Sequence, residues 1–435
     1  MLFCITALDK ITRITISVAL FIIAFVLLSV IRYGQFPVWA KCESIMSINI
    51  LVVVRWPLGG IRTYMKYVYA YLPETFNLTI LAASTHEDGA LRSDADALGA
   101  RLILVPANAK GGLAREIVRE LRQHRYDLIQ SHGFISALQA YAANIMFRIP
   151  HVLTVHGILE ERYLEGIFGR LKKLILAWVI KHISVLYAVS NDILKHLQDQ
   201  IPSIDNAACQ QVVIANGIEV ESLNQDDIAE RNTIRKSLGL GNEIFLIGFL
   251  GRFMPQKGLN FLIEAVEILE KGSEGNTKKL HVLAVGSGDY LPFYQKMASE
   301  KKVDHLFTFI PFQKDVIAIF NDVDMVAMPS IWEASGLLAM EAMCSGTPLI
   351  ASDCIGLRET VAGTPATVFP SGDAAALAEA IQLVRDSDMK PLFVDFAPQA
   401  CERYDVRKTA QAVQMLFEGV VTRQQPRFSE GADGR

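Results

Sequence analysis

The sequence has few cysteines, little excess charge of either sign and no internal repeat of short period. Its six cysteines among 435 residues form no Cys-x-x-Cys pair, which argues against a zinc ribbon or a disulfide framework. A formal net charge of −4 argues against a general nucleic-acid-binding protein, because such proteins present a basic surface. The 51% of hydrophobic residues excludes a disordered chain. The length predicts roughly two or three domains of about 150 residues each.

Residues 1–45 pose a separate question. Residues 14–31 carry no charged side chain, and these 18 residues reach the length at which a helix can span a membrane. A soluble α/β domain could equally start at Met46, since a β-branched stretch follows directly. Two interpretations stay open: a membrane anchor, or an extension upstream of the natural start. With either, we expect a catalytic domain in the cytoplasm, anchored to or associated with the inner membrane in the first case.

From residue 48 onward, short β-branched runs alternate with helical patterns, which is typical of parallel sheets with crossover helices. A polar stretch at 221–242 divides two such series. We therefore predict an α/β protein of two doubly wound, Rossmann-like domains, 46–222 and 223–421, that face each other across a cleft. The last helix is expected to cross back, and a disordered tail, 422–435, to follow. The expected strands are 48–54, 78–82, 101–105, 128–131, 151–155, 186–189 and 211–214, then 244–250, 280–285, 307–310, 325–328, 347–351 and 366–369.

The most informative stretch follows the expected strand 325–328. After a turn, a helix is expected to begin near Gly336. The first amides of that helix, at Gly336, Leu337 and Leu338, would form an anion site suited to a phosphate. Glu333 lies in the preceding loop and Glu341 inside the helix. Ionised carboxylates only accept hydrogen bonds, so this pair suits sugar or ribose hydroxyls.

Two cations follow the expected strand 244–250. Arg252 and Lys257 lie in a loop with glycines on either side. They can neutralise the charge that develops when a nucleotide diphosphate leaves. After the next strand, Gly286 begins a Gly-x-Gly turn, which by itself is a weak signal and is explained equally well as a tight turn.

In the first half, glycines and histidines come directly after strands. Gly59 and Gly60 precede a helix, where they let the backbone approach a ligand. His132 and His156 each end an expected strand, and two histidines facing one cleft favour a functional site. Arg62 is a further candidate for a phosphate or acceptor contact.

Together these motifs resemble those of the family 4 glycosyltransferases, retaining enzymes of the GT-B fold. Glu333 and Glu341 match the two glutamates of the E-x7-E signature, and Gly336 matches its glycine. The resemblance implies that Glu333 faces the donor sugar and that Glu341 binds the ribose. Ser335 replaces the usual aromatic residue, which leaves the identity of the donor open.

The same resemblance extends to the other motifs. It implies that Arg252 and Lys257 bind the diphosphate and that Gly286 lies at the floor of the donor site. In the first half it implies that Gly59 and Gly60 border the donor phosphates, and that His156 lies near the transferred sugar. Glu359, in a further matching stretch, has a structural explanation at least as good as a functional one.

The resemblance implies transfer of a sugar from a nucleotide diphosphate to a glycan or lipid-linked acceptor, in bacterial polysaccharide or glycolipid biosynthesis. The nucleotide sugar is a co-substrate, so no cofactor is expected, and neither is a nucleic-acid partner. No Asp-x-Asp pair lies in a convincing setting for a metal, so we predict a metal-independent enzyme. Two alternatives remain: a GT-B sugar-nucleotide epimerase, and a non-catalytic subunit that binds nucleotide sugars.

Residues 164–183 show an amphipathic pattern. One face carries the apolar residues Ile167, Leu171, Leu174, Ile175, Trp178 and Val179, and the other carries the basic residues Arg170, Lys172, Lys173 and Lys181. Such a pattern is usually a helix packed through its apolar face on its own domain. A basic helix with a tryptophan is also typical of a membrane surface. The packed arrangement is favoured, and a membrane surface is the second expectation.

Overall fold

The computed structural model describes residues 47–423, except 86, 107–108, 110–111, 161–163, 206, 224–232, 273–278 and 314–315. The two interpretations of residues 1–45 therefore concern residues outside the described part. The predicted tail begins inside it, because the last helix continues to Arg423. None of the helices in the described ranges combines the length and apolar character needed to cross a membrane.

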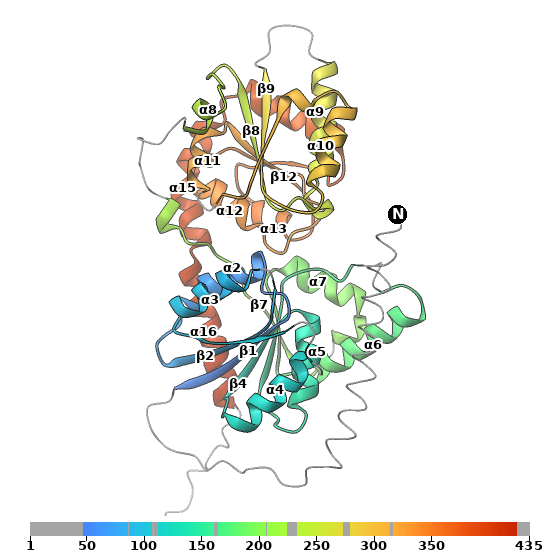
Figure 1. The fold of residues 1–435 in the computed structure, drawn as a ribbon, viewed down its shortest axis with the longest axis vertical. Coiled ribbons are helices and arrows are strands. Elements are labelled where there is room, and N and C mark those ends of the chain that lie inside the picture. Colours follow the sequence, from blue (N-terminus) through green and yellow to red (C-terminus); the bar gives the residue numbers. More distant parts are fainter. Residues whose placement is uncertain are drawn as a thin grey trace, which may run out of the picture.

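Two parallel sheets form the frame of the described residues, as Figure 1 shows. The first has the strand order β3-β2-β1-β4-β5-β6-β7 and the second β10-β9-β8-β11-β12-β13. This arrangement confirms the predicted pair of doubly wound domains. The strands are β1 (Ile48–Val54), β2 (Phe76–Ala83), β3 (Arg101–Val105), β4 (Leu128–His132), β5 (His151–Val155), β6 (Val185–Ala188), β7 (Gln210–Val213), β8 (Phe245–Leu250), β9 (Leu280–Val285), β10 (Phe307–Ile310), β11 (Met325–Met328), β12 (Leu349–Ser352) and β13 (Thr367–Phe369).

Helices connect the parallel strands and cover the sheets. Those of the first domain are α2 (Gly60–Tyr69), α3 (Asp88–Ala97), α4 (Gly112–Gln123), α5 (Phe134–Asn144), α6 (Gly166–His182) and α7 (Asn191–Gln200). Those around the second sheet are α8 (Thr233–Ser237), α9 (Leu259–Lys271), α10 (Leu291–Glu300), α11 (Ile317–Asp322), α12 (Leu337–Cys344), α13 (Leu357–Val361), α14 (Ala374–Asp386) and α15 (Lys390–Tyr404). The last helix is α16 (Val406–Arg423).

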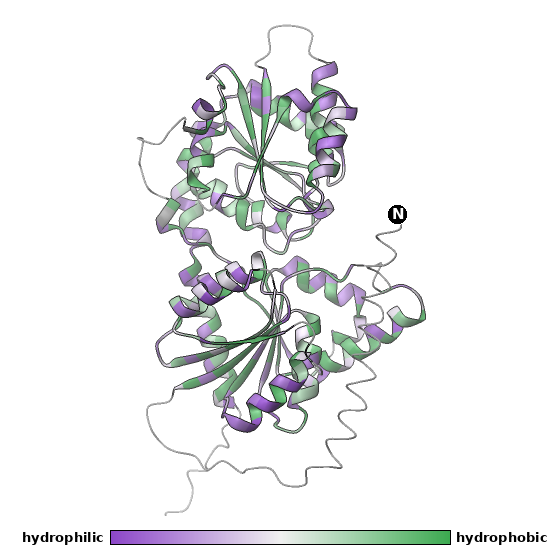
Figure 2. Cartoon of the chain, viewed as in Figure 1, coloured by the Kyte–Doolittle hydropathy of each residue, from purple (hydrophilic) through white to green (hydrophobic). Residues whose placement is uncertain are grey.

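The central strands are apolar along their whole length because both faces of each sheet are covered. In β1, Val52 and Val54 pack into one core and Leu51 and Val53 into the other. Successive side chains of a strand point to opposite faces, so a strand buried on both sides reads as a continuous apolar run. Figure 2 shows this as strands coloured green inside each domain.

The chain crosses between the domains twice, near Ile218 and near Asp405. The two crossing segments are joined by backbone hydrogen bonds. The amide of Ile218 donates to the carbonyl of Tyr404 at 2.8 Å, and the amide of Val406 donates back to Ile218 at 3.0 Å. A Cβ on Gly217 would lie 2.6 Å from the Cα of Val406, so only glycine permits this approach. After the second crossing, α16 packs against α2 and buries Phe417 in the first domain's core (Figure 1).

Helix α6 does not pack as the sequence analysis favours. Its apolar stripe is exposed: Ile167 at 83%, Leu174 at 69% and Leu171 at 50% of their surface. The helix contacts its domain through Leu176, Ala177, Val179 and Ile180, of which Val179 belongs to the predicted apolar face. The predicted face is therefore packed only at its C-terminal end, and its N-terminal part is exposed.

Candidate functional site

The order of strands reverses once in each sheet, between β1 and β4 in the first and between β8 and β11 in the second. Ligands of open α/β sheets bind beyond the carboxyl ends of the strands at such a reversal. The loops after β8 and β11 carry the predicted cations and glutamates. Gly59 and Gly60 lie after β1, at the start of α2, and His132 is the last residue of β4.

In the second domain, the loops after β8 and β11 are joined by a partly buried ion pair. Nζ of Lys257 lies 2.7 Å from Oε1 of Glu333, whose side chain is 9% exposed. The hydroxyl of Ser330 donates to the same oxygen at 2.7 Å. Sequence analysis treated Lys257 and Glu333 as separate ligands; the structure pairs them, so each partly compensates the charge of the other.

Helix α12 begins directly after a glycine in the left-handed conformation. Gly336 precedes the helix with φ 57°, and a Cβ there would lie 2.7 Å from Cδ1 of Leu357. The amides of Leu337 and Leu338 come in the first turn, where no carbonyl of an earlier turn can accept from them. The geometry therefore leaves these amides to bind an acceptor from outside the helix.

Glu341 is a half-buried carboxylate one turn into α12. Among the described residues it has no hydrogen-bond or ion-pair partner. Burial raises the pKa of Glu341 to about 7, because it disfavours the charged form. A carboxyl in this state is stabilised in its ionised form by hydroxyl groups that donate to it.

Two glycines bring the loops of the second domain close together. A Cβ on Gly258 would lie 1.8 Å from the carbonyl oxygen of Pro329, and one on Gly286 would lie 1.8 Å from that of Gly251. Both positions thus require glycine for packing. For Gly286 this supports the explanation as a tight structural turn.

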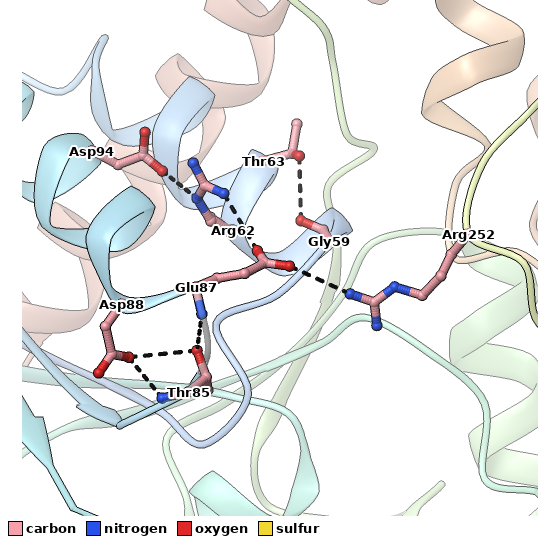
Figure 3. A network of polar contacts seen from close by, with 8 residues as sticks. All are labelled: Gly59, Arg62, Thr63, Thr85, Glu87, Asp88, Asp94 and Arg252. Carbon is pink, nitrogen blue, oxygen red and sulfur yellow. Dashed lines mark hydrogen bonds and ion pairs between the residues drawn. The ribbon is translucent and has the colours of Figure 1, made fainter. Parts of the chain in front are cut away.

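Arg252 extends toward the first domain. As Figure 3 shows, Glu87 lies between two arginines, with Oε1 3.7 Å from Nη2 of Arg252 and Oε2 3.5 Å from Nη1 of Arg62. Arg62 also binds Asp94, with Nε 2.5 Å from Oδ2. The sequence analysis missed Glu87; its position shortly after β2 was the one signal available.

The glycine loop of the first domain is open. Gly59 precedes α2 with φ 55°, and a Cβ on either Gly59 or Gly60 would have no neighbour within 4 Å. The carbonyl of Gly59 accepts from the amide and the hydroxyl of Thr63. The backbone here thus leaves room for a ligand.

His132 and His156 are hydrogen-bonded to each other, and His132 is the more deeply buried of the two. Nε2 of His156 is 2.8 Å from Nδ1 of His132. His132 is only 2% exposed, so the prediction that both histidines face the cleft is wrong for His132. Burial lowers the pKa of His156 to about 3 and that of His132 well below its usual value. Both rings are therefore neutral at physiological pH.

Hydrogen bonds and an ion pair also join the two domains, between the start of α7 and the start of α13. Glu359 accepts from the amide of Asp192 at 3.0 Å and from the side chain of Asn191 at 2.7 Å. In return, the carboxylate of Asp192 accepts from the amide of Gly356 at 3.0 Å and binds Arg358. Glu359 thus has a structural role at the domain interface. Nearby, Nδ2 of Asn216 donates to the hydroxyl of Ser335 at 2.8 Å.

The two parallel-sheet domains have the GT-B fold. HepE of Anabaena, crystallised with UDP and glucose, superposes with a TM-score of 0.72 at 20% identity, over 86% of this chain and all of that one. Sucrose-phosphate synthase of Thermosynechococcus elongatus superposes with a TM-score of 0.69 at 18% identity, over 86% of this chain and 100% of that one.

Sequence comparison gives the family. The "Glycosyltransferase Family 4" profile matches residues 58–222, and "Glycosyl transferases group 1" matches residues 230–397. A D-inositol 3-phosphate glycosyltransferase of Corynebacterium urealyticum is 27% identical over 350 residues, covering 74% of this chain and 82% of that protein. The chain belongs to the family 4 glycosyltransferases, and it is a glycosyltransferase that uses nucleotide sugars in biosynthesis.

Proposed function

We propose that the second domain binds the donor through its diphosphate and ribose, and that the transfer retains the anomeric configuration. The observation that carries this proposal is the cluster at the strand reversal: Arg252, the Lys257–Glu333 pair and the first amides of α12. Arg252 and the amides bind the diphosphate, and Lys257 adds positive charge beside it. Glu341 accepts from the ribose hydroxyls, which the partnerless, desolvated state of its carboxylate supports.

Glu333 has a double role in this proposal. One oxygen, Oε1, is held by Lys257 and Ser330, which fixes the carboxylate. The other oxygen remains to accept from a hydroxyl of the donor sugar. Gly286 supports the floor of this region, while Gly59 and Gly60 border the phosphates from the first domain, and His156 lies beside the transferred sugar.

We propose a same-face substitution without a protein nucleophile. The bond from the anomeric carbon to the diphosphate oxygen breaks, and the acceptor oxygen bonds to the same face of that carbon. The acceptor proton passes to the leaving diphosphate. The protein contributes orientation and electrostatic stabilisation of the charge that develops on the diphosphate. The proposal involves no metal and no cofactor.

The proposed acceptor is a glycan or a lipid-linked polyol. The curated relative acts, by its name, on D-inositol 3-phosphate, an anionic polyol. Arg62 and Arg252 share one carboxylate at the domain interface, and such a pair also suits an acceptor phosphate (Figure 3). The UDP complex of HepE makes UDP-sugars the first donors to try.

The test is a donor and acceptor panel on the full chain. UDP-, GDP- and ADP-sugars are incubated with inositol phosphates or lipid-linked saccharides, and products are identified by mass spectrometry. The anomeric configuration follows from proton NMR couplings. We expect a product with the donor's configuration. An inverted product would overturn the retaining proposal. Isomerised nucleotide sugar formed without acceptor would overturn transfer and favour an epimerase, and binding without turnover would favour a non-catalytic subunit.

We also propose that α6 rests on an anionic membrane surface, which would bring the first domain to a lipid-linked acceptor. Its exposed stripe of Ile167, Leu171 and Leu174 supports this, as do the exposed cations Arg170 and Lys181 on the same helix. Apolar insertion with flanking positive charge is the usual chemistry of interfacial helices.

Vesicle sedimentation tests this surface. The double variant L171E/L174E should lose binding to phosphatidylglycerol vesicles and keep turnover on a water-soluble acceptor. The matched control is M415E, which adds a carboxylate at a 65%-exposed apolar position of α16. Equal binding by L171E/L174E would overturn the proposal. Concentration-dependent dimerisation that L171E/L174E abolishes would instead assign the stripe to a second copy of the chain.

A further inference from the structure

We infer that Tyr69 and Gln130, acting through His132, fix the tautomer of His156 so that its Nδ1 is a hydrogen-bond acceptor for a substrate hydroxyl. This inference rests on the proposed placement of His156 beside the transferred sugar. The four residues come from α2, β4 and the end of β5, and we call them the Tyr69–His156 network. Tyr69 and Gln130 are positioning residues in this assignment.

The network starts at the amide of Gln130, which is fully buried on β4. Its Nε2 donates to Oγ1 of Thr154 at 2.9 Å, which leaves Oε1 to accept from the hydroxyl of Tyr69 at 2.6 Å. A phenol has a single hydrogen to donate. Because Gln130 takes that hydrogen, the oxygen of Tyr69 can only accept from its other neighbour.

That neighbour is His132, whose Nε2 lies 2.8 Å from the hydroxyl oxygen of Tyr69. Nε2 of His132 must therefore carry the hydrogen, and in a neutral ring Nδ1 is then an acceptor. Nε2 of His156 lies 2.8 Å from this Nδ1 and so donates to it. The one hydrogen of the neutral His156 ring is thus on Nε2, and Nδ1 has none.

The surroundings hold the rings in place and keep them neutral. The ring of Tyr64 packs edge-on against both histidines, with centroids 4.9 Å from His156 and 5.5 Å from His132. Burial lowers the pKa of each histidine, so neither becomes a cation near neutrality. In a buried network of this kind the direction of one hydrogen bond sets the direction of the next. Reversing the donor and acceptor at one contact therefore reverses them at all the others.

The consequence is selectivity for the group that meets His156. A ring nitrogen without a hydrogen can accept a hydrogen bond from a hydroxyl. It cannot donate one to a phosphate oxygen, which is itself an acceptor. Inverting the network would place N–H at Nδ1, so that the ring would donate to oxygen atoms instead. The network thereby distinguishes a sugar or polyol hydroxyl from an anionic group at this one position.

Nitrogen NMR of the full chain labelled with ¹⁵N-histidine tests the assignment without ligand. We expect His132 and His156 to show the Nε2–H pattern in the wild type. In Gln130→Met the hydroxyl of Tyr69 is free to donate to His132, and both rings should change to Nδ1–H. In Tyr69→Phe neither tautomer is enforced, and both should be populated. Tyr294→Phe removes a hydroxyl from a buried tyrosine of the second domain, away from the network, and should keep the wild-type pattern.

Kinetics give the second readout. In Gln130→Met, kcat/KM for the donor sugar should fall about tenfold, the value of one hydrogen bond. An Nδ1–H pattern at His156 in the wild type, or wild-type tautomers in a folded Gln130→Met, would overturn the inference. If Gln130→Met does not fold, Tyr69→Phe decides by the same criterion. Wild-type tautomers as inferred in a protein that transfers no sugar would contradict the proposed function alone.

Discussion

Charged groups follow β8 and β11 in the second sheet, whereas the histidines at the ends of β4 and β5 in the first sheet are neutral. Around β8 and β11, Lys257 and Glu333 form a partly buried ion pair, and Arg252 lies in the same loop as Lys257. Around β4 and β5, His132 and His156 are uncharged and bonded to each other. A nucleotide diphosphate requires cations, while hydroxyl groups are recognised by neutral donors and acceptors. In the proposed function, the charged groups after β8 and β11 meet the leaving diphosphate, and the neutral ring of His156 meets a hydroxyl.

The largest expected effect is at the charged region. Lys257→Met should lower kcat by about 10²–10³, since it removes a preorganised positive charge beside the departing diphosphate. It should also destabilise the fold by about 1–3 kcal/mol, because Glu333 loses its cation and keeps only the hydrogen bond from Ser330. The double variant Lys257→Met/Glu333→Gln should regain thermal stability and remain inactive. Near-native turnover of a folded Lys257→Met would contradict the charged assignment.

The neutral region predicts acid sensitivity. Burial holds the pKa of His151 and of His156 at about 3, below the usual 6.5. The unfolded chain therefore binds more protons than the folded one between pH 6.5 and 3, and stability falls as the pH falls through that range. Each histidine contributes up to about 1.4 kcal/mol per pH unit. Urea unfolding at several pH values measures the slope, and His151→Asn should reduce it. An unchanged slope would show that His151 is not held neutral.

A smaller effect is expected at Glu341. Glu341→Gln should weaken nucleoside diphosphate binding about tenfold, since a hydrogen bond to a charged group is lost. Because its pKa is about 7, wild-type affinity should rise between pH 6 and 8 as the carboxylate ionises, and the variant should lose this dependence. Titration calorimetry measures both, with the exposed Glu300→Gln as the control. Equal affinity of Glu341→Gln and wild type would remove the ribose assignment.

The smallest effect is expected where the domains meet in solvent. Arg358→Ala breaks the pairing with Asp192 through a side chain that is 52% exposed, and it leaves the hydrogen bond from Gly356 to Asp192 in place. Exposed pairs contribute about 1 kcal/mol or less, so denaturant unfolding should show a minor loss that 0.5 M salt removes. A loss of several kcal/mol would mean that the contact between the domains, rather than either core, limits stability.

The candidate site of the second domain could be proposed from the sequence because its residues are close together along the chain. Arg252 and Lys257 lie in one loop, and Glu333 and Glu341 flank one helix start. Their pairing could not be predicted, since Lys257 and Glu333 are 76 residues apart and meet only through the adjacency of β8 and β11. The expected strands are all present for the same local reason: buried apolar runs are visible residue by residue.

The arrangement of the first domain depends on contacts that no local pattern contains. Tyr69 and Gln130 are 61 residues apart, and their hydrogen bond follows from where α2 packs on β4. For α6 the sequence gives two faces with different chemistry but not which of them the domain covers. The contact through Val179 and Ile180 leaves the longer apolar stripe outside.

The return of α16 to the first domain has a consequence for synthesis of the protein. Val413 and Phe417 complete the core of the first domain, although they are encoded after the whole second domain. During translation the first domain therefore emerges with part of its core uncovered, and it stays so until residues 406–423 leave the ribosome. A nascent chain stalled before residue 406 should be more readily cleaved by protease in its first domain than the finished protein.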